Sequence, residues 1–230
     1  MPAATLTRPA SRVATTTTPP ARQHAPIVRP DISHRAGLPD ILYRALDPDR
    51  TEPLRVPMSL ADYDRLEYGG KVEYVDGEAV FGVSPRYVHS NLTFEIGFML
   101  KRAFPQLSFG AEPDTVIGKN IRQPDLVMMP FPKDPFGRLR QAPVLIVEVT
   151  SPSTAKEDRT RKADEYLALG VQQYWMANPA KRTITILRND EGAWATIAEL
   201  SADHPYARVK VGEYGEVNVD VNQLMPWDAR

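Results

Sequence analysis

Two acidic residues interrupt short apolar runs near the middle of this chain. Asp125 follows Gln-Pro and precedes Leu-Val-Met-Met, and Glu148 lies within Val-Leu-Ile-Val-Glu-Val-Thr. A carboxylate in a buried strand is costly unless a partner compensates its charge, and the two runs are close enough in sequence to form neighbouring strands. Lys162 follows on a predicted helix after a short loop. Two acids and a lysine are the minimum set for metal-assisted hydrolysis.

Composition limits the chemistry further. The chain has 230 residues, of which 42% are hydrophobic, enough for one main domain with its own core. It has no cysteine, which excludes disulfides, thiolate nucleophiles and cysteine zinc sites and favours a hard cation such as Mg²⁺ or Mn²⁺. No apolar stretch is long enough for a membrane span or a secretory signal, so we expect a cytoplasmic protein that does not associate with membranes. The net charge of −1 argues against binding nucleic acid by bulk charge, but it leaves room for a local basic site.

The chain is predicted to divide near residue 50. Residues 1–30 contain four arginines, no acids and a Thr-Thr-Thr-Thr-Pro-Pro run, a composition that cannot bury enough apolar surface to fold. We therefore expect a largely disordered Pro/Thr/Arg-rich tail over 1–50, with a short helical piece near 41–45, and a globular domain over 51–230. An organellar transit peptide is the alternative for the tail, but its prolines oppose the amphipathic helix that such peptides need.

The domain shows a mixed order of helices and strands. Ser59 is typical of a helix N-cap, and Asp76-Gly77 between two β-type runs predicts a hairpin over 71–83. Helical spacing of apolar residues predicts a helix over 87–103. The remaining predictions are strands at 106–117, 121–129, 144–149, 173–177, 183–188 and 193–199, and a helix at 158–169 that ends at Gly170. This order indicates an α/β sandwich of mixed topology, not a doubly wound βαβ series.

Three residues are the first candidates for the site. Glu148 shares its predicted strand face with Val144 and Ile146, so it continues a buried row, although an acid at a strand end can also reach solvent. Asp125 lies at a strand start, and its alternative is a turn residue that accepts local backbone hydrogen bonds. Lys162 shares a helix face with Tyr166, which directs it toward the sheet, although a solvated i, i+4 pair with Asp158 explains the same spacing.

Three further residues are weaker candidates. His89 lies in the first turn of the long predicted helix, where it is either a metal or substrate contact or a structural histidine. Glu73, in the hairpin, is a ligand or half of a cross-strand pair. Glu95, two turns beyond His89, is the weakest because it can simply face solvent.

Basic residues are in excess around these acids. Residues 119–162 contain nine Lys or Arg, at 119, 122, 133, 138, 140, 156, 159, 161 and 162, against five Asp or Glu, at 125, 134, 148, 157 and 158. A phosphodiester substrate would require such a local basic environment.

The sequence resembles the Uma-two family of proposed restriction endonucleases, a branch of the PD-(D/E)xK nuclease superfamily. The motifs that carry the resemblance are Val-Glu-Tyr-Val-Asp-Gly-Glu at 72–78, Ser-Pro at 84–85 with His89, Pro-Asp-Leu-Val at 124–127, Glu-Val-Thr-Ser-Pro-Ser-Thr at 148–154, Asp-x-x-x-Lys-x-x-x-Tyr at 158–166, Gly-Val-Gln-Gln-Tyr-Trp at 170–175 and Asn-Pro at 178–179. The resemblance covers Met58 to about Trp227 and implies a restriction-endonuclease-like α/β fold, with a mixed central sheet flanked by helices and extra strands at both ends. It also implies that Asp125 and Glu148 are the superfamily's acids.

The superfamily's usual lysine would fall at position 150, where this chain has Thr150. The resemblance therefore implies that the lysine has moved to Lys162. The leading hypothesis is a Mg²⁺- or Mn²⁺-dependent endonuclease that hydrolyses DNA, with Asp125 and Glu148 as metal ligands, Lys162 acting on the water, and His89 in support. The alternatives are a catalytically inactive module that binds nucleic acid or protein, and a hydrolase of another phosphate ester. Whether the protein forms a homodimer is left open.

Overall fold

The computed structural model describes residues 38–47, 49–151 and 155–228. They belong to one compact unit, Gly37–Arg230. Within these ranges no helix has the length and apolar character needed to cross a membrane. The predicted N-terminal tail lies outside the described residues as far as residue 37. Helix α1 (Leu38–Ala45) then begins, and Ala45 is buried in a hydrophobic cluster with Tyr63 and Phe81.

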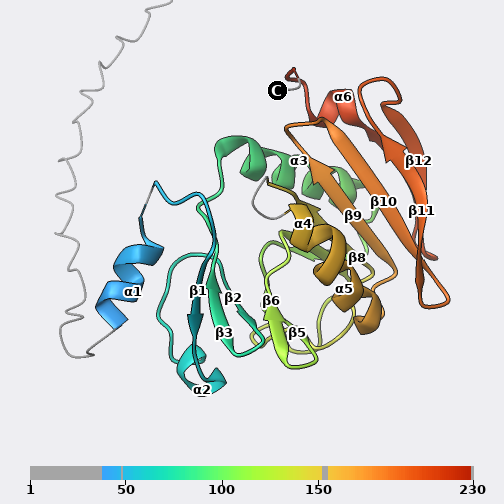
Figure 1. Cartoon of the computed structure of the whole chain (residues 1–230). Helices are drawn as coiled ribbons and strands as arrows, with labels where there is room; N and C mark the ends of the chain where they lie inside the picture. Colours follow the sequence, from blue (N-terminus) through green and yellow to red (C-terminus); the bar gives the residue numbers. More distant parts are fainter. Residues whose placement is uncertain (1–37, 48, 152–154, 229–230) are drawn as a thin grey trace, which may run out of the picture. The chain divides into compact units, whose positions relative to one another are not determined.

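A mixed six-stranded sheet forms the centre of this unit (Figure 1). Its order is β11-β10-β9-β8-β7-β4, with β4 at Ser108–Gly110, β7 at Leu126–Met129, β8 at Leu145–Val149, β9 at Gln173–Asn178, β10 at Thr183–Asp190 and β11 at Ala193–Leu200. Strands β8 and β9 are parallel, because a helical segment joins them, and the other neighbouring pairs are antiparallel. The predicted mixed central sheet is confirmed.

Two smaller sheets supply the additional strands. The first has the order β1-β3-β2-β6-β5, with β1 at Leu54–Pro57, β2 at Val72–Val75, β3 at Glu78–Phe81, β5 at Thr115–Ile117 and β6 at Asn120–Arg122. The second pairs β12 (Tyr206–Val211) with β13 (Gly215–Asp220). The predicted hairpin is confirmed: Asp76 and Gly77 have φ values of 52° and 85°, as a two-residue hairpin turn requires.

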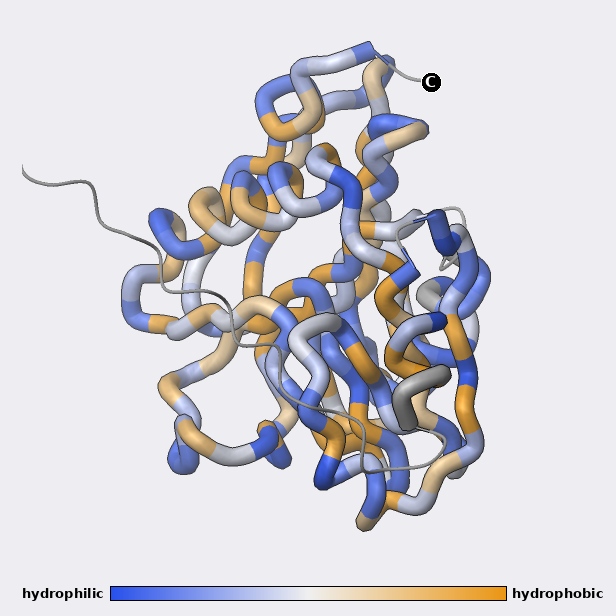
Figure 2. The backbone as a smooth tube through the Cα atoms, turned by 90° about the vertical axis from the view of Figure 1, so that its left-hand side faces the viewer, coloured by the Kyte–Doolittle hydropathy of each residue, from blue (hydrophilic) through white to orange (hydrophobic). Residues whose placement is uncertain are grey.

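Helices cover both faces of the central sheet. Helix α3 (Tyr87–Ala103) has the predicted bounds, and its Leu92, Ile96 and Leu100 pack in one core cluster with alternate residues of β7 and β8. Gly97 allows α3 to approach β7 closely, since a Cβ at this position would lie only 2.9 Å from the Leu126 side chain. Hydrophobic and hydrophilic stretches alternate along the tube in Figure 2.

The opposite face carries the segment that joins β8 to β9. This segment comprises α4 (Ala155–Glu157), a π-helical turn (Asp158–Lys162) and α5 (Ala163–Leu169), which ends at Gly170 as predicted. Ala163 and Tyr166 pack with Val127 and Ile146 in a second core cluster. The alternation predicted for β8 holds from Leu145 to Val149, whereas Val144, which precedes the strand, packs on the α3 side. Two short helices, α2 (Leu60–Tyr63, capped by Ser59) and α6 (Val221–Leu224), complete the unit.

Two of the predicted strands are wrong in extent, because each is divided between two sheets. The run 106–117 forms β4 in the central sheet and β5 in the smaller one, and the run 121–129 forms β6 and β7 in the same way. Prolines explain both breaks, because Pro113 and Pro124 cannot donate a ladder hydrogen bond. In the first break Glu112 also has a φ of 51°, which is incompatible with a strand.

Candidate active site

Asp125 and Glu148 lie opposite each other at one end of the central sheet. The β7–β8 register pairs Leu126 with Val147 and Val127 with Ile146. Extending it by one residue places Asp125 opposite Glu148, and the alternation of side chains directs both toward the α5 side. The backbone N–H of Val149 donates to Oδ2 of Asp125 at 2.7 Å, which fixes this carboxylate against the next strand. Both acids are almost fully buried, with 3% and 2% exposure.

Asp125 is surrounded by positive charge. Nζ of Lys71 lies 2.7 Å from its Oδ1, and Nε2 of His89, from α3, lies 3.2 Å from its Oδ2. Burial alone would raise the pKa of Asp125, but Lys71 and His89 outweigh burial and hold that pKa well below its usual range. Burial would lower the pKa values of His89 and Lys71, but Asp125 outweighs it and raises both. Lys71 and Asp125 therefore form an ionised pair at neutral pH, and Asp125 favours the protonated form of His89.

Glu148 is held by two residues of one helix face. Nζ of Lys162 lies 3.0 Å from its Oε1, and the hydroxyl of Tyr166 donates to the same oxygen at 2.6 Å. The helix face that carries Lys162 and Tyr166 therefore points inward, as predicted. The side chain of Asp158, the alternative partner of Lys162, lies outside the described residues. Burial and the nearby Glu148 raise the pKa of Tyr166 well above its usual value, so Tyr166 remains a neutral donor.

A second buried cluster joins the hairpin to this helix. Arg122 has an exposed fraction of 1% and contacts Glu73 at 3.0 Å, Glu157 at 3.0 Å and Glu165 at 2.5 Å. The other oxygen of Glu73 lies 3.6 Å from Nζ of Lys162. Burial would raise the pKa of Glu73, but Lys162 and Arg122 outweigh burial and lower it to about 2. Glu73 therefore connects the network to Lys162.

The structure thus brings all four predicted site residues to one place. Asp125, Glu148, Lys162 and His89 each contact another member of the set or a shared neighbour, while the weaker candidate Glu95 is exposed on α3. Sequence reasoning missed Lys71 as a site residue. It lies 54 positions before Asp125, so no local spacing could have revealed the contact.

Two further residues acquire a structural explanation. Glu73, which was predicted as a ligand or half of a cross-strand pair, is an ion-pair partner of Arg122 and Lys162. Thr150 donates its hydroxyl to the Ala177 carbonyl at 3.4 Å, so it takes no part in the acidic pair.

The local basic surplus is partly neutralised by acids. Arg161 pairs with Asp76 at 2.6 Å and with Glu165 at 3.0 Å. Arg122 is surrounded by three carboxylates, and Lys119, Arg138 and Lys162 also pair with acids, so at least five of the nine basic residues form ion pairs within the protein.

The donor chemistry of the acidic pair fits a hard divalent cation. Mg²⁺ usually binds through one or two carboxylates and completes its coordination with waters and substrate phosphates. Within the described ranges no three or more His, Cys, Asp and Glu side chains are arranged as a metal centre. Asp125 and Glu148 are therefore the two carboxylates that would hold such an ion.

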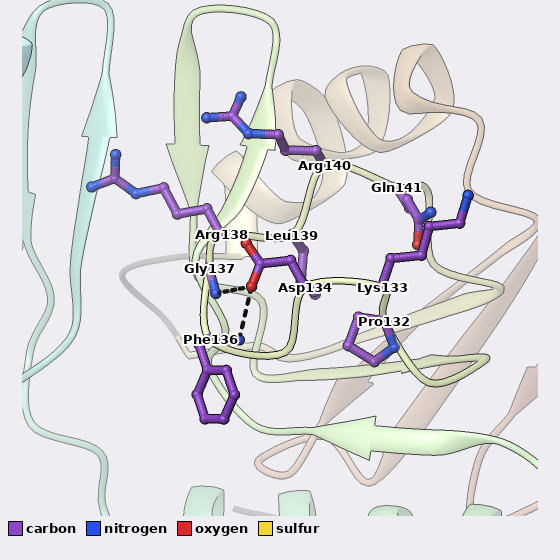
Figure 3. Close-up of a pocket in the computed structure, with 9 residues that line it drawn as sticks. All are labelled: Pro132, Lys133, Asp134, Phe136, Gly137, Arg138, Leu139, Arg140 and Gln141. Carbon is purple, nitrogen blue, oxygen red and sulfur yellow. Dashed lines mark hydrogen bonds between the residues drawn. The ribbon is translucent and has the colours of Figure 1, made fainter.

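A cavity of about 560 Å³ lies away from these acids, in the loop between β7 and β8 (Figure 3). It is lined by residues 132–134 and 136–141. Asp134 accepts the backbone N–H groups of Phe136 and Gly137 at 3.2 and 3.0 Å and stabilises the turn. Arg138 pairs with Asp64 and Asp114 at 2.7 and 3.1 Å. None of the candidate site residues lines this cavity.

Comparison with known proteins identifies the family of this chain. Residues 60–223 match the model of the Uma2 (Uma-two) family, which is described as "Putative restriction endonuclease". The chain belongs to the Uma2 family. No curated protein matches it at a significant level.

A solved structure shares the fold of this Uma2 chain. It is a protein from Anabaena variabilis ATCC 29413, described as "a putative nuclease belonging to DUF820". The TM-score is 0.62 at 21% identity, covering 74% of this chain and 99% of the other. At this identity the similarity establishes the α/β fold with a mixed central sheet expected from the sequence, and no more than the fold.

Proposed function

We propose that this protein is a metal-dependent endonuclease that hydrolyses phosphodiester bonds of DNA. One observation carries the proposal: two buried carboxylates lie opposite each other where the β7–β8 pairing ends, and the ammonium of Lys162 lies 3.0 Å from one of them. Membership of the Uma2 family supports a nuclease activity in general terms. DNA as the substrate and Mg²⁺ or Mn²⁺ as the cation are our inference from the site.

Each residue of the candidate site would have a distinct role. Asp125 and Glu148 would hold the cation. The backbone N–H of Val149 fixes the orientation of Asp125, and the hydroxyl of Tyr166 fixes that of Glu148. When bound, Mg²⁺ would lower the pKa of a coordinated water and compensate charge on the phosphate. Lys162 would orient the attacking water and stabilise developing negative charge. His89 would hold Asp125 in place from α3.

A nuclease assay on purified protein in Mg²⁺ or Mn²⁺ tests the proposal. Asp125→Ala, Glu148→Ala and Lys162→Ala should each lower the cleavage rate by about 100-fold or more, because each removes a group needed to stabilise the transition state. The exposed residues Asp203 and Lys181 provide matched controls, and Asp203→Ala and Lys181→Ala should cleave like the unaltered protein. Cleavage that survives in all three site variants would refute this site.

The alternative is a module that binds nucleic acid or protein without catalysis. It is favoured by the absence of a lysine at position 150 and by the pairing of each acid with an internal lysine. Titration with Mg²⁺ by calorimetry separates the two functions. A binding signal that disappears in Asp125→Ala would count against the binding-only module.

A further inference from the structure

A second lysine, Lys71, reaches the candidate active site from the start of the β2–β3 hairpin in the five-stranded sheet. It directly precedes β2, and its carbonyl accepts the N–H of Gly82 at 2.9 Å, so the closing end of the hairpin fixes its backbone. From this anchor the side chain extends to Asp125, where Nζ lies 2.7 Å from Oδ1. Lys71 is thus bound to one acid as Lys162 is bound to the other.

The two lysines differ in how firmly they are held. Lys162 has 5% of its side chain exposed and lies between Glu148 and Glu73, at 3.0 and 3.6 Å. The side chain of Lys71 is 21% exposed, and among the described residues Asp125 is its one ion-pair partner within 4 Å. Lys71 can therefore leave its partner toward solvent, whereas Lys162 is enclosed.

Lys71 also occupies the oxygen of Asp125 that a metal would need. Oδ2 already accepts the N–H of Val149 and contacts His89. Among the described residues, Oδ1 is contacted by Lys71 alone. Because an ammonium and a divalent cation repel each other, both cannot stay on the same carboxylate oxygen.

We propose that Lys71 is a second catalytic lysine, which neutralises Asp125 in the metal-free protein and binds the substrate phosphate once a divalent cation takes its place. This inference rests on the proposed function for its second half, since the phosphate is that of the DNA substrate. The first half, competition between Lys71 and the cation for Asp125, is independent of cleavage. An ammonium released beside the metal is suited to a phosphate, which it binds as a point charge.

The test uses Lys71→Met, with Lys119→Met as the matched control because Lys119 is 79% exposed and pairs with Asp76 at the hairpin turn. Calorimetry with MgCl₂ and no DNA should show about tenfold tighter binding for Lys71→Met, since removal of an internal competitor makes the binding-competent state more populated. Lys119→Met should bind Mg²⁺ like the unaltered protein. In the nuclease assay Lys71→Met should cleave at least about tenfold more slowly despite its tighter Mg²⁺ binding.

A measurement on the unaltered protein covers the case in which Lys71→Met does not fold. Limited acetylation by acetic anhydride, read at each lysine by mass spectrometry, should increase severalfold at Lys71 when Mg²⁺ is added and stay constant at Lys119. Unchanged labelling of Lys71, or unchanged or weaker Mg²⁺ binding by folded Lys71→Met, would overturn the competition. Unchanged cleavage by Lys71→Met would overturn its catalytic role. If no variant cleaves DNA but Lys71→Met binds Mg²⁺ more tightly, the proposed function fails while the competition stands.

Discussion

At the scale of single residues, each buried charge in the described part of the chain has a partner of opposite charge. Arg122 has 1% of its side chain exposed and is surrounded by three carboxylates. A buried pair of this kind adds little net stability compared with apolar residues, but the loss of one member leaves a charge without compensation. The network therefore fixes the position of Lys162 through Glu73, and removal of one of its members should strongly destabilise the folded state.

Arg122→Met should lower the free energy of unfolding by about 3 to 5 kcal/mol, because it leaves the buried Glu73 and its neighbours without their cation. Urea unfolding followed by circular dichroism measures the change. Arg55→Met is the matched control, since the Arg55–Glu78 pair has side chains that are 42% and 33% exposed, and such a pair contributes less than about 1 kcal/mol. Equal losses in the two variants would contradict the role assigned to Arg122.

At the scale of elements, two local features place the site. β6 ends at Arg122 and β7 begins at Leu126, with Pro124 between them, so the chain crosses from the five-stranded sheet to the central sheet and Asp125 lies directly before the new strand. The π-helical turn Asp158–Lys162 ends at the lysine that contacts Glu148, and π turns of this kind often occur at functional sites. Lys162 is the last residue of the π turn and Tyr166 lies in α5. Both side chains point inward and contact the same oxygen of Glu148.

Gly77→Ala should lower the free energy of unfolding by about 1 kcal/mol or more, because a side chain is strained at its φ of 85°. The strain acts on the hairpin turn whose Asp76 pairs with Arg161 at 2.6 Å. Thermal unfolding measures the effect. Gly69→Ala is the control, since a Cβ there meets no atom within 4 Å and needs no positive φ. An equal effect at both positions would show that the turn is not the cause.

At the scale of the whole molecule, the site lies where two sheets meet. The five-stranded sheet contributes Glu73 and Arg122, and Lys71 lies directly before its strand β2. The central sheet contributes Glu148, and Asp125 lies directly before its strand β7. The helical segment between β8 and β9 contributes Lys162. Stability and site geometry are therefore coupled, because the same ion pairs that hold the sheets together orient the candidate catalytic groups.

This coupling predicts an acid-sensitive fold. The pKa of Glu73 is lowered from 4.5 to about 2, so its ionised form stabilises the folded state above pH 4.5 and this contribution is lost as the pH falls toward 2. The loss should be of the order of 3 kcal/mol. Asp125, whose pKa is also lowered, adds to the decline in the same direction.

Denaturant unfolding at about pH 6 and about pH 3 measures this decline. Glu73→Gln should be less stable than the unaltered protein at the higher pH and should lose less stability between the two, because its amide does not titrate. A decline as steep in Glu73→Gln as in the unaltered protein would contradict the assignment.

The sequence by itself determined the features that depend on neighbours in the chain. Helix α3, the turn at Asp76-Gly77 and the strand that contains Glu148 follow from residue periodicity and turn chemistry, which act over a few positions. The spacing of Lys162 allowed both an inward and a solvated side chain, and the structure decided for the inward one. The resemblance to the Uma-two family then identified Asp125 and Glu148 as a pair.

Only the tertiary structure decided what joins distant segments. It divided two predicted strands between sheets, and it brought Lys71 to Asp125 and Glu73 to Arg122 across separations of 54 and 49 residues. The physical reason is that strand pairing and ion pairing depend on which surfaces meet in space, and local periodicity contains no information about that choice. Two acids and a lysine were visible in the sequence, but the second lysine is visible only once the sheets are joined.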